Sequence, residues 1–205
     1  MIRETKFLFH TMLHPFDGFD GVKFDGKGTV GMSLLLVFMF FLQNVIAAAG
    51  SGFLFSSGDP DKISVPNIFA ISMGTIALWL LSNWAVDSLM DAEGRTREIV
   101  IVSTYSLLPY IIASIATTVL CNFVTLEVVS FLKMILIVGT AWSALMMFVG
   151  MYQIHQLSFG RTVLMIALTV LGMAAMIFLL VLVYSLYRQV YIFVYTIFSE
   201  LMFRV

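Results

Sequence analysis

Charge is scarce in this chain of 205 residues: only 11% are Asp, Glu, Lys or Arg, whereas 60% are hydrophobic. Soluble domains carry about 25% charged residues. One small core cannot bury so much apolar surface, so much of it is expected to face lipid. The formal net charge of -1 also lacks the basic excess typical of nucleic-acid binding. The sequence predicts a protein that is surrounded by the phospholipid bilayer and has no nucleic-acid partner.

Cysteine and catalytic motifs are also scarce. The single cysteine, Cys121, cannot form an internal disulfide or a cysteine-based zinc site. The chain contains no GxSxG, HExxH, Walker or GxGxxG motif. We therefore expect a protein that is not an enzyme and has neither catalytic residues nor a cofactor.

Long charge-free stretches are the strongest positive signal. A helix needs about 20 apolar residues to cross the hydrocarbon core, and an unpaired backbone is not tolerated there. Five stretches qualify, which predicts an all-α polytopic helix bundle with five transmembrane helices. The expected spans are 29–57, 64–86, 99–122, 129–152 and 162–187.

The two ends of the chain differ from this membrane domain (29–187). Residues 1–28 are expected to form an N-terminal interfacial segment, and residues 188–205 a C-terminal amphipathic or apolar helix. That helix either continues the fifth span or turns into the outer interface. Its candidate outer contacts recur at helical spacing: Tyr187, Tyr191, Tyr195 and Phe198.

Lysine and arginine placement predicts the orientation. With the N-terminus inside, the inner segments hold seven of these residues and the outer segments four. Because basic residues are enriched on the cytoplasmic side, this bias favours a cytoplasmic N-terminus and an extracytoplasmic C-terminus.

Polar residues gather where the second and fourth spans reach the inner side. Asn83, Asp87 and Asp91 are spaced four apart, so they share one helix face. The candidate contacts for a partner or a lipid head group are Asn83, Asp87, Asp91, Glu93, Arg95, Arg97, His155 and Arg161. The ordinary interpretation of the pattern is a solvated loop with local salt bridges, and a polar site for a cation, a lipid head group or a basic residue of a partner is the alternative. One histidine and two carboxylates without ligand spacing do not predict a metal site.

The triplet Phe-Asp-Gly begins at Phe16, Phe19 and Phe24. Three carboxylates among glycines suggest a cation loop, but the alternate spacing and closing glutamate of an EF-hand are missing. We therefore interpret the stretch as an interfacial lead-in, with its three phenylalanines dipping into the inner interface and its charges in water.

Other functions remain open from the residues alone. Pro109 is expected to kink the third span. A small-solute transporter or channel is one alternative, which a polar path through Asn44, Asn83 and Asn122 would favour. Lipid binding or membrane shaping by the N-terminal segment and the tail is another.

Three phrases resemble the Yip family of Ypt/Rab-interacting membrane proteins, in its bacterial branch. The most specific is NWAVDSLMDAEGRTREIVIVSTYSLLPY, residues 83–110. HPFDGF (14–19) is similar to the phrase before the first span, and MYQIHQLSFGRT (151–162) to the link before the fifth.

This resemblance implies five helices and a cytoplasmic N-terminus, and we expect the protein to lie in the cell membrane. It carries no catalytic residues. Bacterial relatives accompany components of sugar-uptake ABC transporters, which implies a scaffold or accessory role with other membrane proteins as partners. The N-terminal region is much shorter than in eukaryotic relatives, so binding of a Rab-type GTPase is not expected. The oligomeric state stays open.

Overall fold

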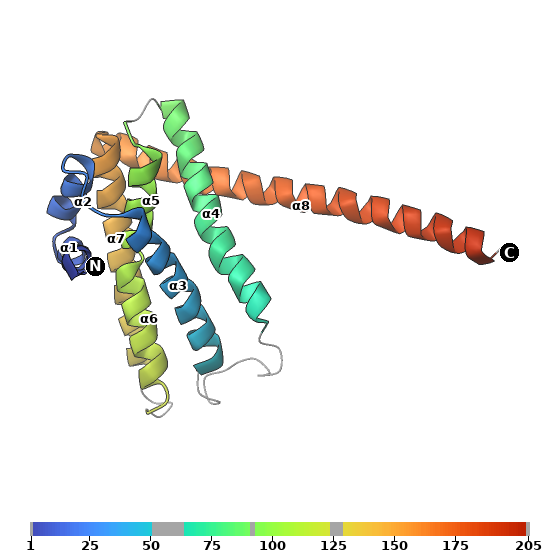
Figure 1. The fold of residues 1–205 in the computed structure, drawn as a ribbon, viewed down its shortest axis with the longest axis horizontal. Helices are drawn as coiled ribbons and strands as arrows, with labels where there is room; N and C mark the ends of the chain where they lie inside the picture. Colours follow the sequence, from blue (N-terminus) through green and yellow to red (C-terminus); the bar gives the residue numbers. More distant parts are fainter. Residues whose placement is uncertain (1, 51–63, 91–92, 124–128, 204–205) are drawn as a thin grey trace.

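The computed structural model describes residues 2–50, 64–90, 93–123 and 129–203, and this part of the chain is helical without strands. The helices are α1 (Ile2–Leu13), α2 (Pro15–Lys23), α3 (Val30–Gly50), α4 (Val65–Met90), α5 (Thr96–Tyr105), α6 (Leu108–Leu120), α7 (Val129–His155) and α8 (Phe159–Phe203). Figure 1 shows α3, α4, α6 and α7 as an upright bundle, with α1 and α2 against its side. The all-α fold is confirmed.

Five helical stretches are long and apolar enough to cross a membrane: Val30–Ala49, Val65–Met90, Thr96–Leu120, Val129–His155 and Phe159–Glu200. The third combines α5 and α6. Each of these stretches overlaps one of the expected spans, because a lipid-facing helix leaves a long apolar run in the sequence. The five-span membrane architecture follows from length and composition.

The third span is interrupted at Ser106 and Leu107, and Pro109 lies in the first turn of α6. Proline has no N–H and its ring clashes with the carbonyl four residues earlier, so a continuous helix is unfavourable here. The N–H of Tyr110 instead donates to Ser143 Oγ of α7 at 2.9 Å. A side chain of the neighbouring helix thus satisfies a backbone donor at the break.

Helices α6 and α7 approach closely just below this break. A Cβ atom on Gly139 of α7 would collide with the side chain of Ala113 of α6 and lie 3.2 Å from the carbonyl oxygen of Pro109. Small residues permit such close backbone approach between helices in membranes. Gly139 therefore fixes α7 against α6, and with it the position of Ser143 one turn away.

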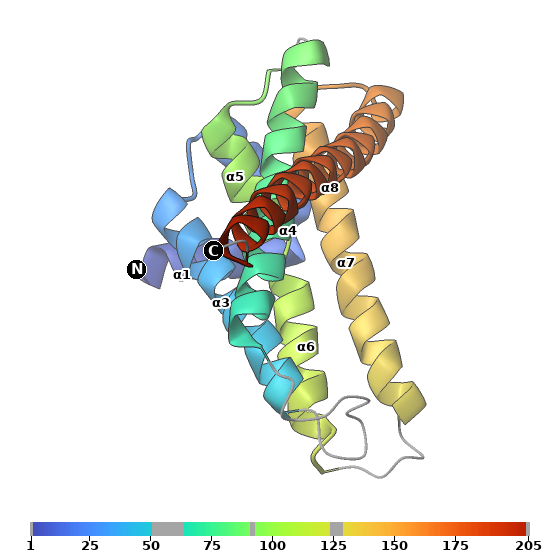
Figure 2. The same ribbon diagram turned by 90° about the vertical axis from the view of Figure 1, so that its right-hand side faces the viewer.

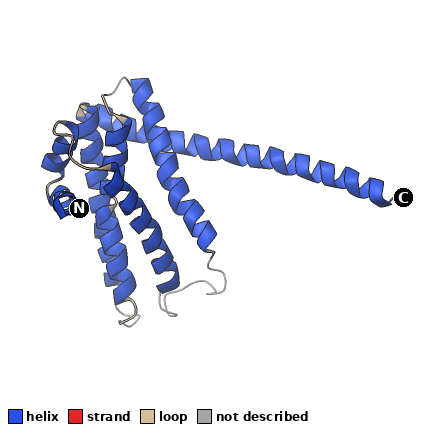
Figure 3. Ribbon diagram, viewed as in Figure 1, coloured by secondary structure: helices blue, strands red, loops and turns tan. Residues whose placement is uncertain are grey.

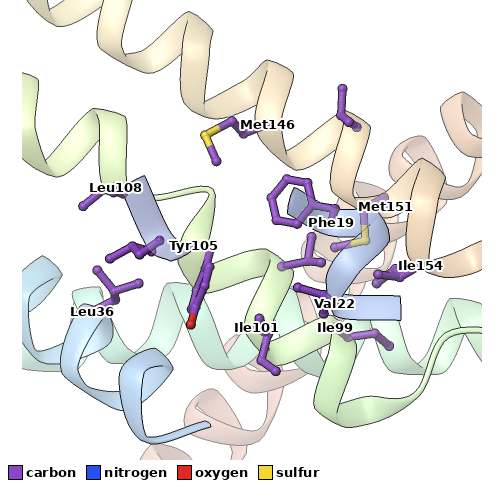
Figure 4. Close-up of a cluster of buried hydrophobic side chains, with 13 residues drawn as sticks. Phe19, Val22, Leu36, Ile99, Ile101, Tyr105, Leu108, Met146, Met151 and Ile154 are labelled. Carbon is purple, nitrogen blue, oxygen red and sulfur yellow. The ribbon is translucent and has the colours of Figure 1, made fainter. Parts of the chain in front are cut away.

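The buried core lies in the half of the bundle where α2, α5 and α7 meet (Figure 4). Its largest fully buried side chains include Tyr105, Phe19 and Met151. Phe19 packs where Gly150 of α7 leaves room beside Val102. This corrects the interfacial interpretation of the Phe-Asp-Gly triplets: Phe19 is fully buried in protein, whereas Phe16 and Phe24 are 55% and 66% exposed.

Helix α8 is one unbroken helix of 45 residues. It leaves the bundle near the end of α7 and runs across the direction of the upright helices (Figures 1 and 2). Its first part packs on α4. Figure 3 shows that the helix continues through Phe203 without a loop, so the tail extends the fifth span.

Candidate functional site

The polar residues predicted on α4 meet the end of α7 and the start of α8. Asn83 is fully buried, and its Nδ2 donates to Thr169 Oγ1 of α8 at 3.4 Å and to Met151 Sδ of α7 at 3.5 Å. One turn further along both helices, Asp87 Oδ1 lies 2.8 Å from His155 Nδ1. Matching four-residue steps on α4 and α7 show that the two helices run in the same direction here.

The Asp87–His155 contact is buried on the histidine side, with a fully covered ring, and 12% exposed on the carboxylate side. The two atoms are close, yet among the described residues neither has a partner of good hydrogen-bond geometry. His155 is the last residue of α7, and the left-handed Gln156 (φ 52°) ends the helix. The contact thus joins the ends of α4 and α7.

Gly94 lies directly against this pair, in the connection between α4 and α5. A Cβ atom at Gly94 would overlap the His155 ring and stand 3.3 Å from Asp87 Oδ1. Only a residue without a side chain lets the backbone approach so closely. The connection is therefore packed onto the ends of both helices.

Lys23, at the end of α2, ties the N-terminal segment to the start of α5. Its Nζ donates to the Glu93 carbonyl oxygen at 2.6 Å and to Glu98 Oε2 at 3.4 Å. Glu98 Oε2 also accepts the Arg95 backbone N–H at 3.2 Å, which caps the first turn of α5. The Lys23 and Glu98 side chains are only 11% and 8% exposed, so this contact is part of the packed structure.

Arg97 holds the link between α2 and α3. Its Nη2 donates to the Gly28 carbonyl oxygen at 2.8 Å and to that of Gly26 at 3.3 Å. Both glycines have positive φ, 63° and 82° for Gly26 and Gly28, a conformation that side chains disfavour. The nearby Asp25 and Lys27 form an exposed ion pair at 2.6 Å. One carboxylate of the Phe-Asp-Gly stretch is therefore already paired.

These residues define the polar end of the molecule: the ends of α2, α4 and α7, the start of α5 and the start of α8. The predicted candidates divide between its interior and its surface. Asn83, Asp87 and His155 face inward, whereas Glu93, Arg95, Arg97 and Arg161 are exposed. Asp91 lies outside the described residues. Within the described ranges, no group of three or more His, Cys, Asp or Glu side chains is arranged to hold a metal ion.

Sequence reasoning missed several partners in this cluster. Lys23 and Glu98 are 75 residues apart, and nothing local indicates that they pair. The sequence does indicate a packing role for Thr169, since the small residues Thr162, Thr169 and Gly172 recur at helical spacing on α8. The first two are fully buried, and Gly172 lies against Ser82 of α4. Thr169 and Gly172 of this stripe lie on the face with which α8 packs on α4.

A cavity of about 440 Å³, the central hollow, opens between the long helices below the polar end. Its lining comes from α3, α4, α6, α7 and the start of α8, and includes Phe40, Trp79, Tyr110, Met147 and Ile166. A smaller hollow of about 200 Å³ shares Phe40, Trp79 and Met147 and reaches Met173 of α8. Apolar side chains dominate both linings.

The predicted outer contacts all lie on the projecting part of α8. Tyr187, Tyr191, Tyr195 and Phe198 are 60–67% exposed. The rings of Tyr191 and Tyr195 stack with centroids 6.4 Å apart. The structure thus places them on one helix, away from the polar end (Figure 1).

Comparison with known proteins gives one match. The family model described as the Yip1 domain matches residues 9–187. No curated protein and no solved structure matches the chain. The matched range includes α2 to α7, the polar end and the first part of α8.

Proposed function

Because the chain belongs to the Yip1 domain family and is a multi-pass membrane protein, we propose that it acts without catalysis, as a scaffold or accessory subunit of a membrane complex. The partner docks on the exposed charges of the polar end, which are Glu93, Arg95, Arg97 and Arg161. The supporting observation is that the inward-facing Asn83 and Asp87 of α4 contact residues of α7 and α8 and so join the ends of these helices. Further contacts hold the backbone at Glu93 and Arg95 and the side chain of Arg97.

Preorganisation is the physical reason that such a surface favours binding. A charged side chain on a free loop loses conformational freedom when a partner docks. Here the loop that carries Glu93 and Arg95 is held by Lys23 through the Glu93 carbonyl and by the Glu98 cap. Arg97 is anchored through two carbonyls of the α2–α3 link. A partner with complementary charges therefore meets a surface that is already ordered.

The interior of the bundle favours a scaffold over a solute transporter. Asn44 Nδ2 donates to the Phe40 carbonyl at 2.9 Å and to Ser72 Oγ at 3.2 Å, so this amide serves helix packing. The central hollow has a mainly apolar lining, in which Phe40 and Trp79 lie one helical turn from Asn44 and Asn83. A polar solute crossing there would leave water without replacement hydrogen bonds.

We place the polar end in the cytoplasm and the protein in the cell membrane. Arg3, Lys6, Lys23 and Lys27 belong to the N-terminal segment, and Arg95, Arg97 and Arg161 to the polar end itself. Positive-inside placement then puts these residues on the cytoplasmic side and the C-terminus on the other. Components of sugar-uptake ABC transporters are the partner class that the family resemblance suggests.

Site-specific photo-crosslinking in native membranes tests this proposal. A photoreactive residue at Arg161 should capture a distinct membrane or membrane-associated protein, which mass spectrometry then identifies. The same residue at Lys133, exposed at the opposite end of α7, is the matched control. Equal capture of the same proteins at both positions, or capture of lipid alone at Arg161, would contradict a partner-binding polar end.

A further inference from the structure

Helices α4 and α7 are joined at the polar end and separate below it. Asn83 Nδ2 of α4 donates to Met151 Sδ of α7 at 3.5 Å. One helical turn further from the polar end, Trp79 and Met147 line the central hollow. The main packing partners of α4 are α3, α5 and α8, and those of α7 are α2, α5, α6 and α8. The two helices thus pack on other helices along the hollow, and Figures 1 and 2 show them diverging from the polar end.

The central hollow lies at the depth of the hydrocarbon layer. Phe40, Trp79 and Ser143 line it, and each lies near the middle of a candidate span, in α3, α4 and α7 respectively. A span covers about 30 Å of hydrocarbon, so residues near its middle lie far from both head-group regions. Thr140 and Ala144, on the α7 side of the lining, are exposed. The hollow is thus open towards the surface of the bundle, where lipid chains are the surrounding medium.

Most polar groups of the lining have partners in the protein. The indole N–H of Trp79 donates to a serine hydroxyl of α5 at 3.0 Å. The hydroxyls of Ser106 and Thr140 each donate to the carbonyl oxygen four residues earlier at 2.8 Å. Ser143 Oγ accepts the backbone N–H of Tyr110, and the Tyr110 hydroxyl is the remaining polar side-chain group of this lining. A ligand of the hollow is therefore apolar, since polar groups that leave water need replacement hydrogen bonds.

The hollow has the size of one hydrocarbon chain. A methylene group takes up about as much space as a water molecule in the liquid, about 30 Å³. The central hollow of about 440 Å³ therefore holds roughly 15 chain carbons. Side chains of α3, α4, α6, α7 and α8 surround it, so a chain inside gains dispersion contacts on several sides at once. Lipid on the outer face of one helix does not make such contacts, and an empty hollow would forfeit them.

We propose that the central hollow holds one acyl chain of a membrane phospholipid as a resident ligand, which stays bound when the surrounding lipid is exchanged. At this depth of the bilayer, phospholipid chains are the apolar molecules at hand. The chain fills the space between α4 and α7 and joins the two helices where they do not pack on each other. The recognised feature is the apolar chain, because the lining offers little to a head group. This inference does not rest on the partner-binding polar end.

Fluorescence quenching of Trp79 tests whether a lipid chain enters the hollow. Trp84→Phe and Trp142→Phe leave Trp79 as the single tryptophan of the chain. The variant is placed in nanodiscs of a phospholipid that carries bromine in the middle of its acyl chains, and in nanodiscs of the same lipid without bromine. Because bromine quenches tryptophan only at short range, the difference reports a chain close to the Trp79 ring.

We expect brominated lipid to quench most of the Trp79 fluorescence. Ala144→Phe and Thr140→Phe, which fill the hollow from its exposed side, should each restore most of it. Val138→Phe, exposed on α7 outside the lining, should leave the quenching unchanged. Fluorescence that brominated lipid does not change would show that no lipid chain enters the hollow. Equal quenching in all three variants would place the chain elsewhere around α4. Either result would overturn the proposal.

Native mass spectrometry tests whether the lipid is resident. After the protein is washed in detergent, the wild type and Val138→Phe should each retain one phospholipid per chain, and Ala144→Phe should lose it. A wild type that retains none would show ordinary exchanging lipid, and retention by Ala144→Phe would place the lipid at another site. A retained apolar compound of another class would contradict the phospholipid. Capture of a protein at Arg161 is measured separately, so this proposal and the partner-binding polar end fail independently.

Discussion

At the scale of single residues, the phenylalanines of the three Phe-Asp-Gly triplets lie in different environments. Phe16, Phe19 and Phe24 each precede Asp-Gly, yet only Phe19 is buried. Its burial depends on Gly150 and Val102, which are more than 80 residues away along the chain. Local sequence is equivalent at the three positions, so it cannot tell which ring packs in the core. Tertiary contacts decide between interface and core.

Replacing Phe19 by alanine should therefore destabilise the fold much more than replacing Phe24. Loss of a fully buried phenyl ring costs about 3–5 kcal/mol, because it removes apolar contact and leaves a cavity. Phe24 is 66% exposed, so its replacement should change little. Reversible unfolding of both variants in mixed detergent micelles measures the difference. Equal loss of stability would place both rings in the same environment and contradict the assignment.

Gly94 makes a second prediction at this scale. A methyl group at Gly94 would overlap the His155 ring, so Gly94→Ala should lower the thermal midpoint by separating the α4–α5 connection from α7. Gly74 of α4 has open space around its Cβ position, and Gly74→Ala should be neutral or raise stability by about 0.5–1 kcal/mol through helix propensity. A thermal shift assay compares the two. A neutral Gly94→Ala variant would refute the close packing.

At the scale of elements, the interrupted third span depends on its neighbour. The Tyr110 N–H has its acceptor in Ser143 of α7, next to the close α6–α7 approach at Gly139. The sequence locates the break well, because Pro109 is unfavourable inside a helix. It does not identify the acceptor, since scattered serines in spans ordinarily bond within their own helix. Folding selects one serine by bringing α7 alongside.

Ser143→Ala should thus cost about 1–3 kcal/mol, because a backbone donor loses its acceptor away from water. Thr140→Ala is the matched control on the same helix, since Thr140 Oγ1 bonds only its own Leu136 carbonyl. Unfolding in detergent should rank Ser143→Ala as the more damaging substitution. The reverse ranking would mean that the break in the third span does not need α7.

At the scale of the whole molecule, the sequence predicts the membrane architecture and leaves its assembly open. Lipid demands long apolar runs, so five spans could be recognised without a template. The structure also brings polar residues of α4 and α7 together, whereas helical spacing predicted only that Asn83 and Asp87 share one face of α4. Pairings such as Lys23 with Glu98, and the course of α8 across the bundle, depend on long-range packing that no local pattern encodes.

The most direct test of the central claim reverses charge at the polar end. The double variant Arg95→Glu and Arg161→Glu should lose its partner protein in affinity purification from native membranes, because both side chains are exposed and the reversal replaces attraction by repulsion. Lys133→Glu, at the other end of α7, should retain it. Recovery of an unchanged partner set by the double variant, at wild-type abundance in the membrane, would contradict the claim that the polar end is the docking surface.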